Sequence, residues 1–208
     1  MAGCTIVHIS TIVHFMRSTE SQQRQQSDRR QLILDTTLRL IAAGGIDSVT
    51  HRKVADAAGI PLGSTTYYFD SREHLLGEAF EYYITMAMAL HESLISGPIN
   101  SSHELVDFLV ELTERELDDE PLLLAEYEMT LFAARNERIA GLLHEWDSVM
   151  IANIVAALTG LGAKRPEDAG RTILHCIRGY ELDRLSRHAA DPEGFRRRIE
   201  NVVAAFIR

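Results

Sequence analysis

The sequence predicts an all-α protein, in which an N-terminal three-helix domain with a helix-turn-helix is followed by a larger helical bundle, about nine helices in total. Runs rich in Ala, Leu, Glu and Arg dominate, and these residues favour helices. No strand-like alternation of apolar and polar residues extends beyond a few positions. Signals that begin and end helices recur along the whole chain. The 208 residues, 46% of them hydrophobic, suffice for a sizeable core.

The first predicted helix covers residues 28–43. Its apolar positions fall near helical spacing, and Gly44 and Gly45 end it; these positions are Leu32, Ile33, Thr36, Leu40 and Ile41. Residues 1–26 are expected to form a flexible extension, with the polar segment 21–27 (SQQRQQS) loose. Met16 resembles an ordinary start, so residues 1–15 are interpreted as an upstream extension or a flexible arm.

Two short helices are predicted next. Thr50 is a suitable N-cap for a helix over 51–58, and Gly59 is suited to the left-handed conformation that ends it. Pro61 favours the entry of a helix over 62–68. The pattern is that of a helix-turn-helix, whose second helix lies in the DNA major groove.

The remaining six helices are located by their caps and breakers. Capping boxes begin at Asp70 and Ser101, and prolines mark three later starts. The predicted helices run from the Asp70 box to about Ser96, from the Ser101 box to 118, from Pro121 to Asn136, over 137–159, from Pro166 to His188, and from Pro192 to Ile207.

The charge is unevenly distributed. The formal net charge is −9, yet residues 17–72 carry a net +2 and residues 73–208 a net −11. The asymmetry favours contact of the first part with a polyanion. Cys4 and Cys176 form no disulfide framework or zinc pattern, as expected in a reducing cytoplasm. No apolar run is long enough to span a bilayer, and no signal peptide is evident, so a cytoplasmic location without a membrane partner is expected.

Residue types around the helix-turn-helix suit DNA. His51, Arg52 and Lys53 stand at a helix N-terminus, where cations and the helix dipole meet a phosphate. Small or hydroxyl side chains let the next helix approach base edges, and tyrosine hydroxyls reach phosphates. The remaining predicted DNA-contacting residues are Thr50, Leu62, Gly63, Ser64, Thr65, Thr66, Tyr67, Tyr68 and Arg72. Leu62 is expected either to touch a thymine methyl or to pack, and Phe69 is expected in the core.

Residues 50–76 (THRKVADAAGIPLGSTTYYFDSREHLL) resemble the TetR/AcrR family of one-component transcriptional repressors. They follow its pattern of a capped helix, an A-x-x-A-G turn, a recognition helix ending in Tyr-Tyr-Phe, and a Ser-Arg-Glu-x-Leu-Leu start of the next helix. The upstream ILDTTLRLIAAGGIDSVT also matches, so the resemblance covers about residues 28–80. Leu62 and Gly63 depart from it, because many relatives carry a polar or basic residue there.

The resemblance implies a DNA-binding domain over 27–72 and a ligand-binding and dimerisation domain over 73–208. On the DNA side it places Thr50, Arg52, Ser64, Thr66, Tyr67, Tyr68 and Arg72. It implies a homodimer that represses transcription at a palindromic operator in double-stranded DNA and is released by an unknown small-molecule inducer. Neither a cofactor nor a catalytic activity is implied.

Two sets of residues follow from that expectation. Adaptable Met, aromatic and polar positions are predicted to line the inducer pocket: Tyr83, Met86, Glu126, Met129, Phe132, Trp146 and His175. Glu126 and Glu128 lie in an otherwise apolar stretch; one of them is a candidate counter-charge for a cationic ligand, and at least one is expected to point to water. The apolar faces of the last two helices are predicted to form a four-helix dimer interface: Ile173, Ile177, Tyr180, Phe195, Ile199, Val202, Val203 and Phe206.

Two alternatives remain open at this stage. One is a helical-bundle enzyme with a His/Glu site, although the nine histidines form no HExxH or other metal spacing and no metal site is predicted. The other is a ligand-binding or adaptor protein whose helix-turn-helix no longer binds DNA, which the acidic total charge permits.

Overall fold

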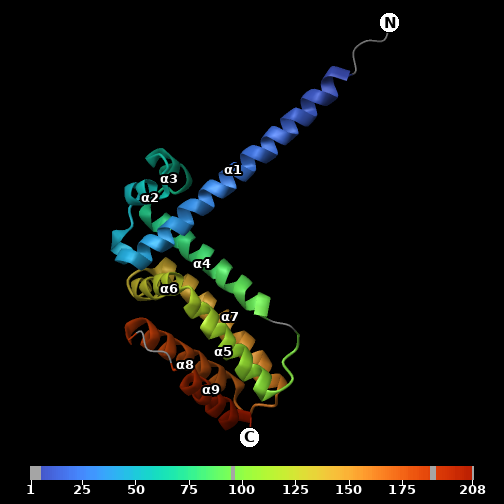
Figure 1. The fold of residues 1–208 in the computed structure, drawn as a ribbon, viewed down its shortest axis with the longest axis vertical. Coiled ribbons are helices and arrows are strands. Elements are labelled where there is room, and N and C mark those ends of the chain that lie inside the picture. The colour runs from blue at the N-terminus through green and yellow to red at the C-terminus, as the bar shows by residue number, and fades with distance from the viewer. Residues whose placement is uncertain (1–5, 95–96, 188–190, 208) are drawn as a thin grey trace.

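The computed structural model describes residues 6–94, 97–187 and 191–207, with side chains from Gln25 onward. These residues form nine α-helices and one short 3₁₀ helix, and the described ranges contain no strand, which confirms the predicted fold class (Figure 1). The elements are α1 (Ile6–Gly44), η1 (Ile46–Ser48), α2 (His51–Ala58), α3 (Leu62–Tyr68), α4 (Arg72–Leu94), α5 (Ser102–Asp118), α6 (Glu120–Ala133), α7 (Glu137–Gly160), α8 (Pro166–Arg187) and α9 (Pro192–Ile207).

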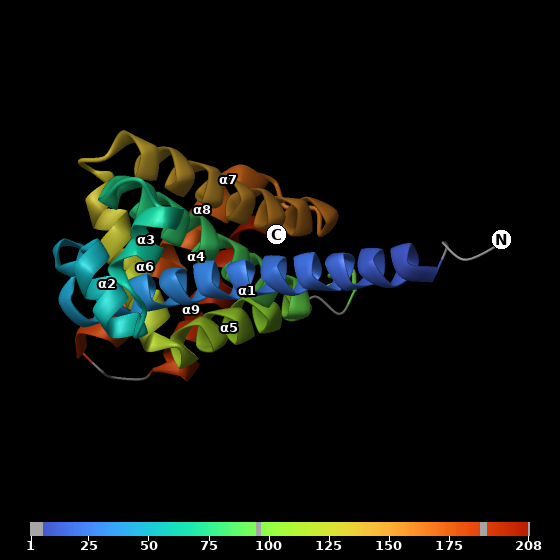
Figure 2. The same ribbon diagram turned by 90° about the horizontal axis from the view of Figure 1, so that it is seen from above.

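Helix α1 is longer than the sequence predicted. It begins at Ile6 instead of Asp28, and the segment 21–27 that was expected to be loose lies within it. Its N-terminal part extends away from the other helices, while its C-terminal part packs against them (Figures 1 and 2). Polar residues such as Gln and Arg are compatible with helix, so composition alone misplaced this boundary.

The buried face of α1 also differs in register from the expected one. Ile33 and Ile41 are buried as predicted, whereas Leu32 is 43% exposed. Leu34 and Leu38 take the inward positions that the sequence analysis gave to Leu32 and Thr36. The inward set therefore follows the spacing i, i+1, i+5 and i+8, which is one face of a helix.

The local signals of the helix-turn-helix act as predicted. The Thr50 side chain accepts a hydrogen bond from the Lys53 amide at 3.2 Å, and α2 and α3 have the predicted bounds. Gly59 has φ 65 and ψ 34, so a residue without a Cβ is favoured at the turn.

Several helix ends shift by a few residues for identifiable reasons. Ser71 rather than Asp70 caps α4, because its hydroxyl accepts the His74 amide at 3.0 Å. Ser101 caps α5 as predicted, at 3.1 Å from the Glu104 amide. Helix α6 ends at Ala133, before the expected Asn136, because the Asn136 side chain caps α7 instead. The expected ends at Ser96 and His188 lie outside the described residues.

The apolar core has two parts. The first joins α1 to α4 and to one side of α6 and α7, and it includes Phe69, Phe80, Met129 and Trp146. This core crosses the predicted domain boundary at residue 72, so the helix-turn-helix is packed directly on the bundle. The second lies among α5, α7, α8 and α9 at the other end of the molecule from α2 and α3 (Figure 1). No described helix is long and apolar enough to cross a membrane.

The second core corrects the predicted dimer interface. Six of the eight residues assigned to it are at most 5% exposed and pack inside the protomer, namely Ile173, Ile177, Tyr180, Phe195, Ile199 and Val203. The Tyr180 and Phe195 rings stack with centroids 4.2 Å apart. Val202 and Phe206 are half-buried against the same cluster. Apolar periodicity identified the inward faces of α8 and α9 but could not tell an internal core from an interface.

Replacing Phe195 by Ala is expected to lower the free energy of unfolding by about 3–5 kcal/mol, because a fully buried ring is removed from the second core. Leu131→Ala on α6 is the control: Leu131 is 73% exposed, and the expected loss is below about 1 kcal/mol. Urea denaturation of both variants measures the difference. Equal and small losses in the free energy of unfolding of the two variants would show that α9 does not pack in the core of the protomer.

Candidate nucleic-acid interface and bundle cavity

Helix α3 has only seven residues and is held by contacts that its own side chains make. Thr65 is fully buried, and its hydroxyl donates to the Leu62 carbonyl at 2.8 Å and lies 3.4 Å from the His51 carbonyl on α2. Thr65 was predicted to contact DNA, and this is wrong: its hydroxyl is used inside the domain. Helical spacing places Tyr67 on the opposite side of α3, and both Thr66 and Tyr67 are exposed.

Arg72 also has an internal partner that the sequence did not reveal. Its guanidinium donates to the Val49 carbonyl at 2.9 Å and to the Ile46 carbonyl at 2.6 Å. The side chain therefore ties the start of α4 to the link between α1 and α2. The predicted DNA contact is replaced by this structural role, because carbonyl groups of a turn need donors.

The other predicted residues lie at the Thr50 cap of α2, in the first turn of α2 and along α3. Thr50, Arg52, Lys53, Leu62, Gly63, Thr66 and Tyr67 are exposed, and His51, Ser64 and Tyr68 are half-buried. Tyr67 is 72% exposed and contacts the Tyr68 ring edge-on at 5.0 Å. A Cβ added to Gly63 would meet no atom within 4 Å, so this side of α3 is open. The His51 Nδ1 atom is buried without a hydrogen-bond partner in the described part of the chain.

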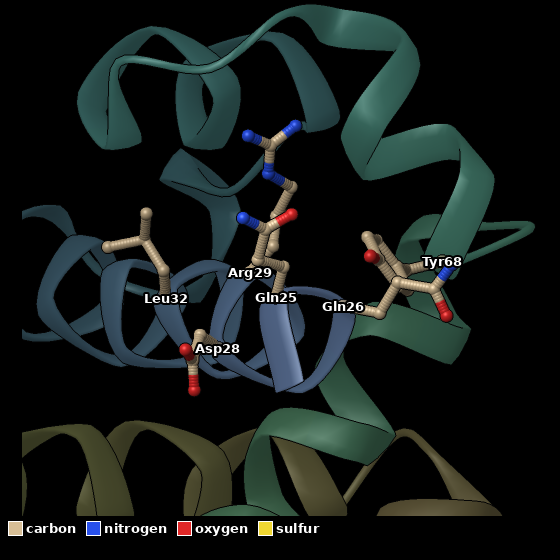
Figure 3. Close-up of a pocket in the computed structure, with 6 residues that line it drawn as sticks. All are labelled: Gln25, Gln26, Asp28, Arg29, Leu32 and Tyr68. Atoms are coloured by element: carbon tan, nitrogen blue, oxygen red, sulfur yellow. The ribbon is translucent and has the colours of Figure 1, made fainter. Parts of the chain in front are cut away.

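A polar groove of about 650 Å³ lies between α1 and the end of α3 (Figure 3). Its lining residues are Gln25, Gln26, Asp28, Arg29, Leu32 and Tyr68. Arg29 thus adds a cation beside the α3 surface. This position of Arg29 was not predicted, because α1 was expected to begin at Asp28, after a loose segment that holds the glutamines. The clustered QQRQQSDRR composition was the available signal.

The predicted pocket residues do not line one cavity. Tyr83, Glu126, Met129 and Trp146 are buried inside the bundle. Met86 and Phe132 are half-buried, and Met86 borders a separate cleft of about 400 Å³ between α1, α4 and the start of α6. His175 is exposed on α8, so its assignment to a pocket is wrong.

Polar side chains from five helices meet inside the bundle. Tyr83 on α4 donates to the Glu126 carboxylate on α6, and Tyr127 donates to Glu181 on α8 at 2.5 Å. His91 Nε2 lies 3.0 Å from the Glu116 carboxyl on α5. The Arg178 guanidinium pairs with Asp147 on α7, with one nitrogen–oxygen distance of 3.2 Å. This interior polar cluster is defined by Tyr83, His91, Glu116, Glu126, Tyr127, Asp147, Arg178 and Glu181.

Burial controls the ionisation of the cluster. Burial raises the pKa of Glu116 to about 8, and the negative charge of Glu126 adds to this shift. Burial also raises the pKa of Glu181 to about 8, and the charge of Glu116 adds to that shift. Burial and the nearby Glu181 raise the pKa of Glu126 to about 7. Burial lowers the pKa of His91 to about 4, so its imidazole is neutral near neutral pH. Glu116 and Glu181 were not foreseen, because each lies among charged residues in the sequence.

An apolar cavity of about 350 Å³ borders this cluster at His91. It lies between α4, α5 and α7, with Pro98 and Ile99 of the connection after α4 at one side. Phe108, Leu112, Met150 and Ile154 contribute to its walls. No group of three or more His, Cys, Asp or Glu within the described ranges is arranged to hold a metal ion.

Comparison with known proteins gives two family matches. Residues 33–79 match the model described as "Bacterial regulatory proteins, tetR family", and residues 100–208 match "Tetracyclin repressor-like, C-terminal domain". The curated repressor KstR of Mycolicibacterium smegmatis is 31% identical over 115 residues, 54% of this chain and 55% of its own. The match therefore spans about half the length of that relative.

Solved structures agree with the fold. A transcriptional regulator from Rhodococcus sp. Rha1 superposes with a TM-score of 0.76 at 16% identity, covering 86% of this chain and 95% of its own. The multidrug binding protein EbrR in complex with ethidium is 25% identical with a TM-score of 0.67, covering 84% of this chain and 98% of its own.

The raised carboxyl pKa values predict that stability falls as the pH rises from 7 to 8.5. Glutamates in the unfolded chain titrate near 4.3, so over this range the folded protein holds protons that the unfolded chain has lost. The expected loss is on the order of 1 kcal/mol per pH unit for each carboxyl that stays protonated. His91 does not oppose it, because its pKa lies below this range in the folded state and near 6.5 in the unfolded state.

Urea denaturation at three pH values measures this slope. Glu181→Gln is expected to flatten it, and Asp118→Asn, an exposed carboxylate on α5, is expected to leave it unchanged. A wild-type stability that rises over this range would contradict the assigned protonation.

Proposed function

This chain belongs to the TetR family of bacterial regulatory proteins, and we propose that it is a DNA-binding transcriptional repressor whose operator affinity is set by a small molecule. The observation that carries the proposal is the exposed surface of α2 and α3. It offers hydroxyls at Thr66 and Tyr67, cations at Arg52 and Lys53, and an open flank at Gly63. These groups suit phosphates and base edges at the rim of a major groove.

The two predicted domains take the two roles in this proposal. Residues 27–72 form the DNA-binding domain, and residues 73–208 form the domain for ligand binding and dimerisation. The curated relative KstR is itself a repressor, and EbrR was solved with a bound small molecule, which supports a ligand response here. The protein would act in the cytoplasm, where its DNA target is.

A homodimer would present two copies of α3 to one DNA face. A two-fold protein reads a palindrome when its recognition helices stand about 34–36 Å apart. The outward faces of α7 and α8 carry Val149 and Leu182, 39% and 47% exposed, and they are the surfaces left for a partner once the inward faces are buried. A ligand that favours a different spacing would release the operator by a population shift.

Replacing both Arg52 and Tyr67 by Ala is expected to weaken binding to DNA of any sequence, because the two side chains are assigned to phosphates. The affinity should fall about tenfold, and the slope of log K against log salt should shrink by about one. Fluorescence anisotropy with a labelled random-sequence duplex of about 30 base pairs measures both at low salt.

Lys164→Ala is the matched control, because it removes an exposed cation from the connection between α7 and α8. It should leave affinity and slope unchanged. If the double variant binds as the wild type does, or if the control weakens binding equally, the assigned surface is not the DNA site.

A further inference from the structure

The apolar cavity has a polar end. Its walls between α4, α5 and α7 are mostly aliphatic and aromatic, and the His91 imidazole is the titratable side chain that borders it. The volume of about 350 Å³ lies within the usual range for sites that take drug-sized molecules. A ligand with an apolar body would fill the chamber and place any polar group against His91.

His91 is fixed with one ring nitrogen occupied and one available. Its side chain is 9% exposed, and its Nε2 atom lies 3.0 Å from the Glu116 carboxyl. The ring packs on Trp146 with centroids 5.5 Å apart, which sets its orientation. The Nδ1 atom has no hydrogen-bond partner in the described part of the chain. It can accept a hydrogen bond from a ligand when Nε2 carries the proton.

The charges behind His91 are unbalanced. The interior polar cluster holds four carboxyl groups, those of Glu116, Glu126, Asp147 and Glu181, and one guanidinium, that of Arg178. Arg178 is already paired with Asp147. Three buried carboxyl groups therefore share no further cation among the described residues of the cluster, and they avoid the cost of burying charge by holding protons.

We infer that this cavity binds an organic cation with an apolar body, which donates a hydrogen bond to His91 Nδ1 while Glu116 supplies the counter-charge. The inference rests on the proposed function, because it treats the bundle as the ligand-binding domain. It adds the location of the site, the chemical class of the ligand and the two residues that select it. A neutral molecule of the same size would gain nothing from ionisation of Glu116, and an anion would enter beside the carboxyl groups without a cation to balance its charge.

Binding of a cation exchanges one proton. Without ligand, protonated Glu116 donates to His91 Nε2, and the imidazole proton is on Nδ1. With the cation bound, the Glu116 proton is released to solvent, and the imidazole proton moves to Nε2 and is donated to the carboxylate. The Nδ1 lone pair then accepts from the ligand. The charge of the site is conserved, because one cation enters as one proton leaves.

The groups that face Glu116 fix the direction of the pH dependence. They are Tyr83 and His91 on α4, Glu126 on α6, and Arg178 and Glu181 on α8. Burial and the charge of Glu126 favour keeping the Glu116 proton, whereas the hydrogen bond with Glu181 and the charge of Arg178 oppose it. Affinity for a permanent cation should therefore rise from pH 6 to pH 8, as the proton becomes easier to displace.

Three fluorescent probes test the class of ligand on the full-length protein without DNA. Ethidium is a permanent cation, Nile red is neutral, and 1-anilinonaphthalene-8-sulfonate is an anion. Ethidium is expected to bind at least tenfold more tightly than either of the others. Calorimetric titration of ethidium in phosphate and in Tris at pH 7 is expected to show release of up to one proton per bound cation.

Two variants locate the site. Glu116→Gln mimics the protonated carboxyl, so it should lower ethidium affinity at least tenfold, remove its pH dependence and leave Nile red within threefold. His91→Phe keeps a ring against Trp146 and should also lower ethidium affinity. Asp118→Asn, which removes an exposed carboxylate from the same helix, should change nothing. Thermal melts confirm that each variant is folded.

Equal affinity for ethidium and Nile red, no ethidium binding, or an unchanged affinity in folded Glu116→Gln would each overturn the inference. None of these outcomes bears on DNA binding. A protein that shifts DNA but ignores ethidium keeps the proposed DNA role and loses the cation site. A protein that binds ethidium at Glu116 but not DNA shows the reverse.

Discussion

A seven-residue helix cannot hold its conformation in water alone, and the DNA-facing surface depends on how α3 is anchored. Thr65 bonds inward beside α2, Gly59 makes the turn that sets the two helices against each other, and Arg72 ties α4 to the preceding link. These contacts use the inward groups, and Thr66 and Tyr67 are exposed at the surface, where the Thr66 hydroxyl donates to the Gly63 carbonyl at 3.3 Å and keeps its acceptor lone pairs accessible. The same contacts therefore hold α3 in place and leave its outer face exposed.

Similar contacts join the helix-turn-helix to the bundle. Phe69 lies in a core that continues through α4 into α6 and α7. The Ile46 amide, at the link before α2, lies 3.4 Å from the Glu128 carboxylate on α6. Two residues earlier, Glu126 points into the interior polar cluster. One helix therefore touches both the ionisable interior and the link that positions α2 and α3, and close-packed helices transmit such displacements as rigid bodies.

Local sequence signals predicted the parts of the fold that depend on neighbouring residues. Thr50, Gly59 and Pro61 specify their turn through backbone geometry, so α2 and α3 were placed correctly. The contacts that a side chain makes depend on packing between distant elements, and these contacts were less predictable from the sequence. Thr65 and Arg72 look like DNA contacts in sequence but meet carbonyl groups, and Phe195 looks like an interface residue but fills the core. Glu116 and Glu181 become a buried pair only when α5 and α8 meet.

Selection of bound duplexes from a random DNA pool tests the central claim most directly, because it needs no assumption about the operator. If the exposed face of α3 reads DNA as part of a two-fold dimer, the enriched sequences will converge on a palindrome with half-sites about one helical turn apart. Recovery of no preferred sequence, or of sequences without two-fold symmetry, would contradict the account.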